Sequence, residues 1–174
     1  MKTLICKTIK SIPRDQWEAC RFSKAGGDPF LSYDFFFLLE SSNSVGPNTG
    51  WVPFYITFKE NNIVVGIIVS FLKTHSQGEY VFDHSWADAY QRSGANYYPK
   101  LQVAVPFTPV SGERILVRPE NENQVDEMIS SAKRLVKENN LSSLHVTFCN
   151  DSFVGVARKN SLLVREGIQY HWFN

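Results

Sequence analysis

The stretch Phe54–Leu72, FYITFKENNIVVGIIVSFL, decides the fold of this chain. Apolar side chains alternate from Phe54 to Phe58, Glu60-Asn61-Asn62 supplies turn residues, and Ile63–Leu72 is a β-branched apolar run. This pattern predicts a β-hairpin. Because the second strand is nearly all apolar, we expect it to be central and covered on both faces.

A strand and two helices are expected on the amino-terminal side of the hairpin. A β-prone run predicts a strand at Leu4–Ile9. Pro13 suits the first turn of a helix that carries Trp17 and Ala19 inward. The Asp28-Pro29 pair is an N-cap followed by an N1 proline, which predicts a helix at Pro29–Ser41.

The strongest helical pattern lies on the carboxyl-terminal side, at Asn123–Asn139, where apolar residues recur on one face. Asn121 and Gln124 resemble a capping box at its start. The other elements expected are strands at Ile115–Val117 and Leu144–Phe148, a helix at Asp151–Lys159, and closing strands at Leu162–Val164 and Ile168–Trp172. This order predicts an α/β mixed sheet, with an antiparallel hairpin early and a βαβ crossover late.

Composition limits the class of protein. A chain of 174 residues is expected to form one domain, and its net charge of +1 gives no global field toward DNA. Its three cysteines form no C-x-x-C pair, so neither a zinc site nor a disulfide scaffold is expected, and free thiols suggest the cytoplasm. The longest apolar run is about half of a membrane span, so no membrane span is expected.

The segment Lys73–Val110, KTHSQGEYVFDHSWADAYQRSGANYYPKLQVAVPFTPV, fits neither a helix nor a buried strand as a whole. A helical turn or two at Ser85–Gln91 and a strand at Leu101–Ala104 are the elements expected within it. Long loops in compact domains are usually functional or disordered, and disorder is depleted in aromatic residues. This aromatic-rich segment is therefore expected to be ordered around a ligand or a partner.

The chemistry expected of this segment is acid–base and anion-binding. Asp83, His84 and Asp88 form a candidate acid–base cluster, with hydrogen bonds to the local backbone as the alternative. Tyr97, Lys100 and Arg118 are candidates to orient a carboxylate or phosphate, with surface salt bridges as the alternative. Gln169 and His171 share one face of the last expected strand, either lining a cleft or as a solvated edge. Nucleotide-binding, hydrolase and metal motifs such as Walker A and H-E-x-x-H are absent.

Several segments resemble a known family. They are DPFLSYDF (28–35), SVGPNTGW (44–51), KTHSQGEYVFDHSWADAY (73–90), YYPKLQVAVPFTPVSGERIL (97–116), LSSLHVTF (141–148) and REGIQYHWFN (165–174). Across them the chain resembles the bacterial Fem-like GNAT acyltransferases, described as peptidoglycan biosynthesis or recognition proteins. The resemblance implies a GNAT-like fold and a cytoplasmic N-acyl or aminoacyl transferase that acts on an amine of a cell-wall precursor or similar acceptor.

The same resemblance implies that residues 1–174 are the first of two GNAT-like domains and supply the acceptor cleft. The implied donor is acyl-CoA or aminoacyl-tRNA, with no firmly bound cofactor and no metal. The glycine-containing acyl-CoA loop of GNAT proteins is missing before the helix that follows Phe148, so this half is not expected to grip a pyrophosphate in the usual way.

Thirteen residues are the candidates for this site. Asp83 or His75 is the expected base, and the lining is expected to comprise Lys73, Glu79, Trp86, Asp88, Tyr90, Tyr97, Lys100, Gln102, Arg118, Gln169 and His171. Two alternatives stay open: a non-catalytic module that binds a peptide or glycan through its aromatic loop, and a homo-oligomer in which exposed aromatic surface is buried in a second copy.

Overall fold

The computed structural model describes residues 1–22, 26–81, 83–168, 170 and 172. Within these residues the strands are β1 (Lys2–Cys6), β2 (Trp51–Pro53), β3 (Tyr55–Glu60), β4 (Ile63–Ile68), β5 (Ser70–Lys73), β6 (Lys100–Val103), β7 (Ile115–Val117) and β8 (Leu144–Val146). The α-helices are α1 (Arg14–Phe22), α2 (Tyr33–Ser41), α3 (His84–Arg92), α4 (Val125–Glu138) and α5 (Asp151–Lys159). Short 3-10 helices occur at Ile9–Ser11, Pro29–Leu31 and Pro119–Gln124.

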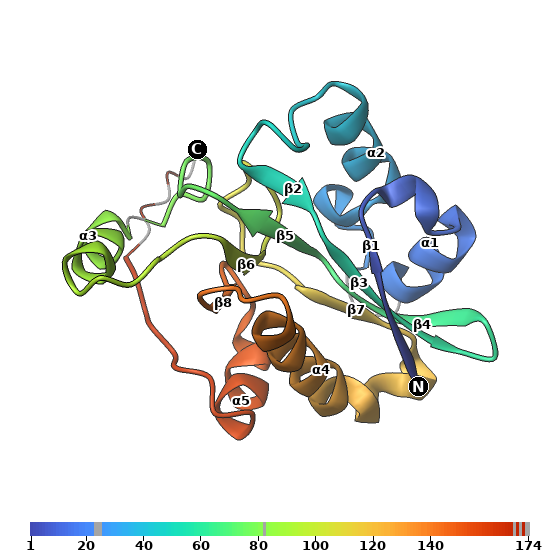
Figure 1. Ribbon diagram of the computed structural model, residues 1–174. Coiled ribbons are helices and arrows are strands. Elements are labelled where there is room, and N and C mark those ends of the chain that lie inside the picture. Colours follow the sequence, from blue (N-terminus) through green and yellow to red (C-terminus); the bar gives the residue numbers. More distant parts are fainter. Residues whose placement is uncertain (23–25, 82, 169, 171, 173–174) are drawn as a thin grey trace.

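The molecule has three layers, with a β layer between two pairs of helices. The strands form two four-stranded sheets, ordered β1-β3-β4-β7 and β2-β5-β6-β8. Figure 1 shows α1 and α2 on one side of these strands and α4 and α5 on the other. Two hydrophobic clusters fill the spaces between the layers, one around Trp17 and Phe36 and the other around Met128 and Phe153. The predicted α/β class is confirmed.

The predicted hairpin is confirmed, since β3 and β4 pair antiparallel across Asn61 and Asn62. Both asparagines have positive φ, as a two-residue type I′ turn requires. The strand β4 is also central: Val64 and Ile67 pack toward α1 and α2, whereas Val65 and Ile68 pack toward α4 and α5. Burial on both faces explains why this run contains so few polar residues.

One strand was predicted at Ile63–Leu72, but the structure contains two. The chain leaves the first sheet after Ile68 and enters the second at Ser70. The neighbouring strand divides in the same way at Phe54, whose backbone N–H donates to the Ser70 carbonyl. The Ser70 hydroxyl returns a bond to the Phe54 carbonyl at 2.5 Å. These two bonds join the sheets where both strands bend.

The predicted late βαβ crossover is not formed by the two strands that flank α4. The strand β8 pairs parallel with β6 in one sheet, whereas β7 pairs antiparallel with β4 in the other. Residues 104–114 leave the sheet between β6 and β7, and Pro106 and Pro109 in this excursion cannot donate ladder hydrogen bonds. The excursion returns beside the end of β8, where Gly112 and Cys149 form a parallel bridge.

Several predicted boundaries need correction. Ile9 belongs to a 3-10 helix capped by Thr8 rather than to the first strand. Ser32 ends the 3-10 helix that starts at Pro29 and caps α2 by accepting from the Phe35 N–H. The capping box at Asn121 and Gln124 was wrong, because both side chains donate to Glu60 instead.

The predicted helix at Asp151–Lys159 is confirmed as α5, with Asn150 as its N-cap, whose side chain accepts from the Phe153 N–H. The closing strand at Leu162–Val164 is absent, since these residues pair with no other strand in the described part of the chain. The described residues of Ile168–Trp172 show no strand, and Gln169 and His171 lie outside the description. No described helix is long and apolar enough to cross a membrane.

Glu40, near the end of α2, joins three elements. Its carboxylate accepts from the Ile9 N–H at 2.8 Å, the Thr8 hydroxyl at 2.6 Å and the Tyr55 hydroxyl at 2.9 Å. Tyr55 is fully buried, and burial together with the Glu40 charge raises its pKa well above the usual value. The hydroxyl therefore stays protonated and donates. One carboxylate thus fixes α2 against β3 and the turn that follows β1.

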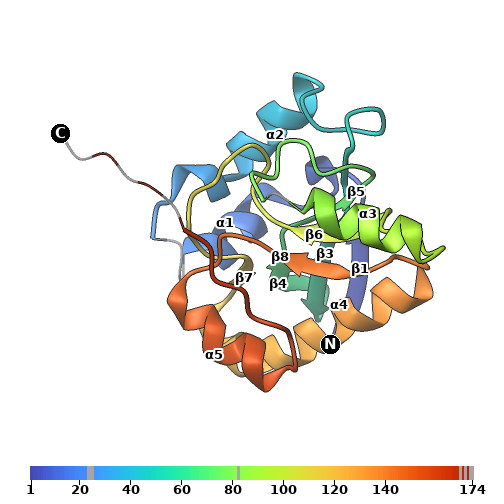
Figure 2. The same cartoon turned by 90° about the vertical axis from the view of Figure 1, so that its left-hand side faces the viewer.

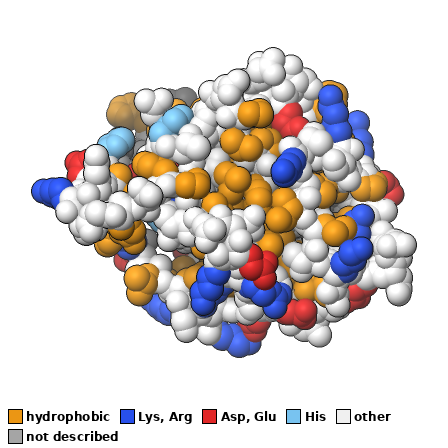
Figure 3. Space-filling model, in the orientation of Figure 1, with side chains coloured by type: hydrophobic (Ala, Val, Ile, Leu, Met, Phe, Trp, Pro, Cys, Tyr) orange, Lys and Arg blue, Asp and Glu red, His pale blue; other side chains and the backbone are white. Residues whose placement is uncertain are grey.

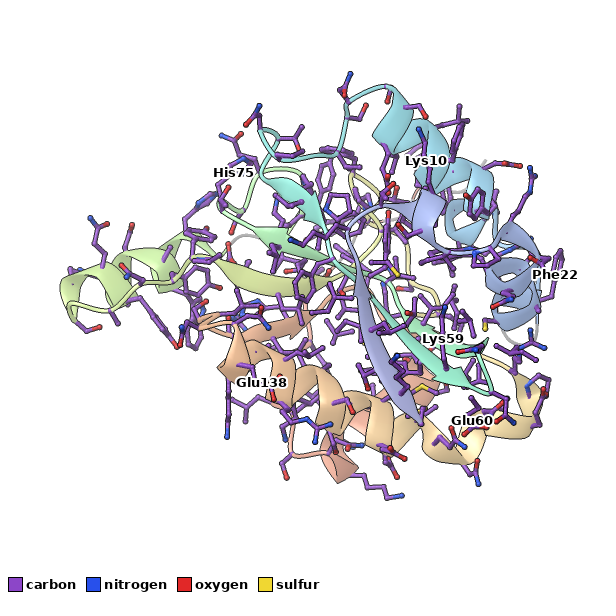
Figure 4. The ribbon with its side chains drawn as sticks, turned by 45° about the vertical axis from the view of Figure 1, so that its right-hand side comes forward. Lys10, Phe22, Lys59, Glu60, His75 and Glu138 are labelled. Atoms are coloured by element: carbon purple, nitrogen blue, oxygen red, sulfur yellow. The ribbon has the colours of Figure 1, made fainter. Side chains whose placement is uncertain are left out.

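We predict that Glu40→Ala lowers the free energy of unfolding by about 2 to 3 kcal/mol, because it leaves three donors without their acceptor. The matched control is Glu138→Ala at the exposed end of α4 (Figure 4), which should change stability by less than about 0.5 kcal/mol. Urea denaturation measures both variants. Equal effects of the two substitutions would contradict the role assigned to Glu40.

Candidate functional site

The candidate site starts from two lysines that face each other across a strand pair. Lys73 ends β5, Lys100 begins β6, and the antiparallel register places them directly opposite. Both side chains are fully buried. Like charges at opposed positions destabilise a sheet, and a buried ammonium needs a partner. The connection between the two strands must therefore bring negative charge back to this point.

Two carboxylates from that connection provide the charge. The Lys100 ammonium donates to Glu79 Oε2 at 2.9 Å and to Asp83 Oδ2 at 2.6 Å. The Lys73 ammonium lies 3.9 Å from Glu79 Oε1, donates to the Gln77 carbonyl at 3.0 Å, and sits 3.8 Å from the centre of the Trp51 ring. Glu79 and Asp83 are each 4% exposed. We call Lys73, Glu79, Asp83 and Lys100 the buried charge network.

Aromatic and polar side chains enclose the buried charge network. The Tyr97 hydroxyl donates to Asp83 Oδ2 at 2.7 Å, and its ring packs edge-on against His145 at 5.8 Å. The Ser76 hydroxyl is hydrogen-bonded to the Tyr98 hydroxyl at 2.6 Å. These contacts hold both ends of the connection against the sheet.

Burial and charge set the protonation of the network. Burial would raise the pKa of Asp83, but interactions with Lys100, Ser76 and Tyr97 outweigh it and hold that pKa at about 2. Burial raises the pKa of Glu79 despite the opposing pull of Lys100 and Lys73. Burial also lowers the pKa of Lys73 to about 8, because Glu79 offsets only part of the desolvation. Asp83 is thus firmly ionised, whereas Glu79 and Lys73 are the groups brought closer to neutral pH.

Three buried acceptors of this region lack hydrogen-bond donors among the described residues: Glu79 Oε1, Asp83 Oδ1 and Gln102 Oε1. Gln102 lies next to the network on β6 and donates through Nε2 to the Thr147 hydroxyl at 3.0 Å. Buried acceptors in native proteins nearly always have a donor. These three oxygen atoms can therefore accept hydrogen bonds from N–H or O–H groups of a ligand.

The structure brings six of the thirteen predicted site residues together: Lys73, Glu79, Asp83, Tyr97, Lys100 and Gln102. Tyr90 reaches the edge of this group, since its ring packs on Tyr97 at 5.3 Å. Trp86 and Asp88 are exposed on α3, which lies at the periphery in Figures 1 and 2 and has no buried residue. Arg165 lies over the Trp86 ring at 5.5 Å.

Two further predicted residues, His75 and Arg118, lie outside this group. His75 is labelled in Figure 4 and packs on Gly50, where an added Cβ would lie 2.0 Å from His75 Nε2. Its Nδ1 accepts from the Gln77 N–H at 3.2 Å, so it supports the loop. Arg118 follows β7 and donates through Nε to the Val64 carbonyl at 2.9 Å. Gln169 and His171 lie outside the described residues.

Sequence reasoning missed Trp51, Ser76, His145 and Thr147 as neighbours of the site. The contacts of Lys73 with the Trp51 ring and of Lys100 with Ser76 join residues that are distant in the sequence, so no local sequence pattern indicates them. His145 and Thr147 come close because β8 pairs with β6, which places His145 beside Gln102. Knowledge of that strand pairing would have identified both residues.

Comparison with known proteins places this chain in a family. The family model for FemAB-like proteins, described as peptidoglycan biosynthesis/recognition, matches residues 8–174. The chain belongs to the FemAB-like family. No curated protein matches the chain.

The fold is that of GNAT acetyltransferases. An aminoglycoside acetyltransferase from an uncultured soil metagenomic sample, in complex with sisomicin, aligns with a TM-score of 0.57 and 13% identity over 99% of this chain and 95% of its own. AAC(6')-Iy in complex with a CoA bisubstrate analogue aligns with a TM-score of 0.56 and 11% identity over 100% and 99%. The Acinetobacter haemolyticus 6'-N-acetyltransferase AAC(6')-IG aligns with a TM-score of 0.50 and 14% identity over 100% and 97%. The predicted GNAT-like fold is therefore confirmed.

We predict that Lys100→Met lowers the free energy of unfolding by about 3 to 5 kcal/mol, because two buried carboxylates lose their common partner. Lys137→Met, an exposed position on α4, removes the same charge and should change stability by less than about 0.5 kcal/mol. Chemical denaturation compares the two. A small loss for Lys100→Met would show that the network does not hold the loop.

We also predict an acid-sensitive stability that depends on His145. Burial, and then the Lys100 charge, lower the pKa of His145 to about 4, while the Asp83 charge opposes them only in part. Between about pH 6.5 and 4 the unfolded chain therefore binds more protons than the folded chain, so stability falls as pH falls through this window. In His145→Gln this part of the pH dependence should be lost. The measurement is the free energy of unfolding at half-unit pH steps, and an unchanged slope in the variant would refute the assignment.

Proposed function

We propose that the chain takes part in N-acyl or aminoacyl transfer to an amine of a cell-wall precursor or a similar, muropeptide-like acceptor in the bacterial cytoplasm. The family description supports the connection with peptidoglycan. The fold supports acyl transfer, since the aligned structures are aminoglycoside acetyltransferases. The acceptor side of the reaction is assigned to the buried charge network.

The observation that carries this proposal is the set of donor-less oxygens in the network. A primary amine offers N–H donors, and Glu79 Oε1 and Asp83 Oδ1 are acceptors without hydrogen bonds in the described structure. An amine placed there satisfies oxygens that otherwise carry a desolvation cost. An anionic acceptor would instead face two carboxylates.

Glu79 is the proposed proton acceptor. An acceptor amine is protonated at neutral pH and must lose a proton before it attacks an acyl carbonyl. Glu79 is the better base because its pKa is raised by burial, whereas the pKa of Asp83 lies near 2. Asp83 then acts by holding Lys100 and Tyr97 in place. The role predicted for Asp83 or His75 as the base stays a prediction, with Glu79 preferred on this chemistry.

Proton and electron movements balance in this scheme. The ammonium gives one proton to Glu79, the free amine forms a C–N bond to the acyl carbonyl, and the leaving thiol or hydroxyl departs with a proton released on collapse of the tetrahedral intermediate. The network is buried, since Lys73 and Lys100 are fully buried and Glu79 and Asp83 are each 4% exposed, so an acceptor reaches Glu79 only when surrounding residues move. Tyr80, next to Glu79 in the chain, is exposed and has φ +55.

A second candidate function is a binding module without catalysis. The observation that favours it is the exposed aromatic surface beside the network, where Tyr80 is 55% and Trp86 49% exposed. Such side chains stack on sugar rings or on peptide side chains. On either function, a second GNAT-like domain or a second copy of the chain is the proposed partner that completes the cleft.

We predict that Glu79→Gln lowers kcat/KM for amine acylation by at least about 100-fold, because it removes the base. Asp83→Asn is the matched comparison: it should lower stability more than Glu79→Gln does, since it weakens the bonds from Lys100 and Tyr97. Transfer is measured by mass spectrometry on a panel of amino sugars and muropeptides, with several acyl donors. Full activity of Glu79→Gln would remove Glu79 from the mechanism, and no transfer by the wild type from any donor would favour the binding module.

A further inference from the structure

A groove of about 540 Å³ lies between the start of α4 and α5. Glu122 and Asp126 line one wall, and Ser152, Gly155 and Lys159 line the other. Aligned acetyltransferase structures hold CoA or a CoA analogue. A CoA donor carries a pyrophosphate, which proteins commonly bind with free N–H groups at the positive end of a helix. In this groove, such N–H groups would have to come from the start of α4 or of α5.

The start of α4 is acidic. Glu120 and Glu122 lie in the 3-10 helix that leads into it, and Asp126 and Glu127 lie in its first turn. Four carboxylates oppose the positive end of the helix dipole and repel phosphate. No glycine occurs between Gly112 and Gly155, so no glycine-rich turn before α4 lets the backbone approach a phosphate.

The cations near the groove already have partners. Lys159, the one cation among the described lining residues, forms an ion pair with Asp126. Hydrogen bonds from Lys159 and Asn160 lower the pKa of Asp126, so this carboxylate is ionised. Arg118 precedes the acidic segment, but its Nε donates to the Val64 carbonyl. Figure 3 shows charges of both signs over the region of α4 rather than a basic patch.

No other α-helix in the described part of the chain offers a better phosphate site. The helices α1, α2 and α5 each have an aspartate in the first turn, at Asp15, Asp34 and Asp151. The N-cap of α3 is Asp83, a member of the buried charge network. Every described α-helix therefore starts with a carboxylate, which occupies or repels the position that a phosphate would need.

We infer that this chain does not hold its acyl donor through a nucleotide pyrophosphate. A donor that acts here therefore gains no binding energy from a pyrophosphate at these helix starts. The consequence for transfer rests on the proposed function, whereas the statement about pyrophosphate binding does not. The two can therefore be tested separately.

The binding test is titration calorimetry of the full chain with CoA in low-salt buffer. The wild type should show no CoA binding with a Kd below about 1 mM. Glu122→Lys reverses a charge in the groove, and its Kd for CoA should be at least about 5-fold below that limit. Glu138→Lys makes the same change at the far end of α4 and should leave CoA binding unchanged; melting temperatures establish that both variants fold. Micromolar binding by the wild type that weakens with salt and in Lys159→Met would overturn the inference, as would equal gains in both variants.

The transfer test compares acetyl-CoA with S-acetyl-N-acetylcysteamine, which keeps the thioester arm but has no nucleotide. The inference expects values of kcat/KM within about 3-fold of each other, because the pyrophosphate contributes no binding energy. A preference of about 100-fold or more for acetyl-CoA would overturn it. If neither donor nor any other yields transfer, the proposed function fails, and the calorimetric result still decides the donor inference.

Discussion

The opposition of Lys73 and Lys100 is the constraint on which the irregular half of this molecule depends. Two buried ammonium groups on adjacent strands are tolerable only with two carboxylates beside them, and Glu79 and Asp83 come from the connection between those strands. The connection therefore returns to the end of the sheet at two points, Glu79 and Asp83. The helix α3 is then carried outside, beginning directly after Asp83. Charge compensation, together with the buried Tyr97, orders the loop.

Local patterns were sufficient to predict the elements that depend on local forces. The hairpin at Asn61 and Asn62 and the main part of α4 follow from turn chemistry and from apolar periodicity. The division of Ile63–Leu72 into two strands was not predictable, because an apolar run does not show which neighbour it pairs with. Pairing of β8 with β6 was likewise hidden, since it depends on how residues 104–114 leave the sheet. Long-range pairing, rather than propensity, decides these features.

The same distinction holds for the site. Lys73, Glu79, Asp83 and Lys100 could be named from the mixture of charges and aromatic residues in one segment. That mixture also named Trp86 and Asp88, which are exposed, because composition does not separate a buried carboxylate from a solvated one. Arg118 was included on its chemistry alone and lies beside the start of β4, where its Nε donates to the Val64 carbonyl, whereas Lys73 lies at the end of β5. Burial and strand register distinguish these cases, and neither can be deduced from the residue types alone.

The placement of carboxylates affects both the acceptor and the donor of the proposed reaction. The chain has 17 acidic and 18 basic residues, and the near-neutral net charge does not show how these charges are distributed. Acidic residues stand at the helix starts and in the buried charge network, where Glu79 Oε1 and Asp83 Oδ1 have no hydrogen-bond donor among the described residues. An amine meets oxygens that need N–H groups, whereas a polyphosphate meets carboxylates at every described α-helix start. On the proposed function, the acceptor and the donor are therefore selected by one electrostatic rule, which favours groups that donate hydrogen bonds and disfavours multiply charged anions.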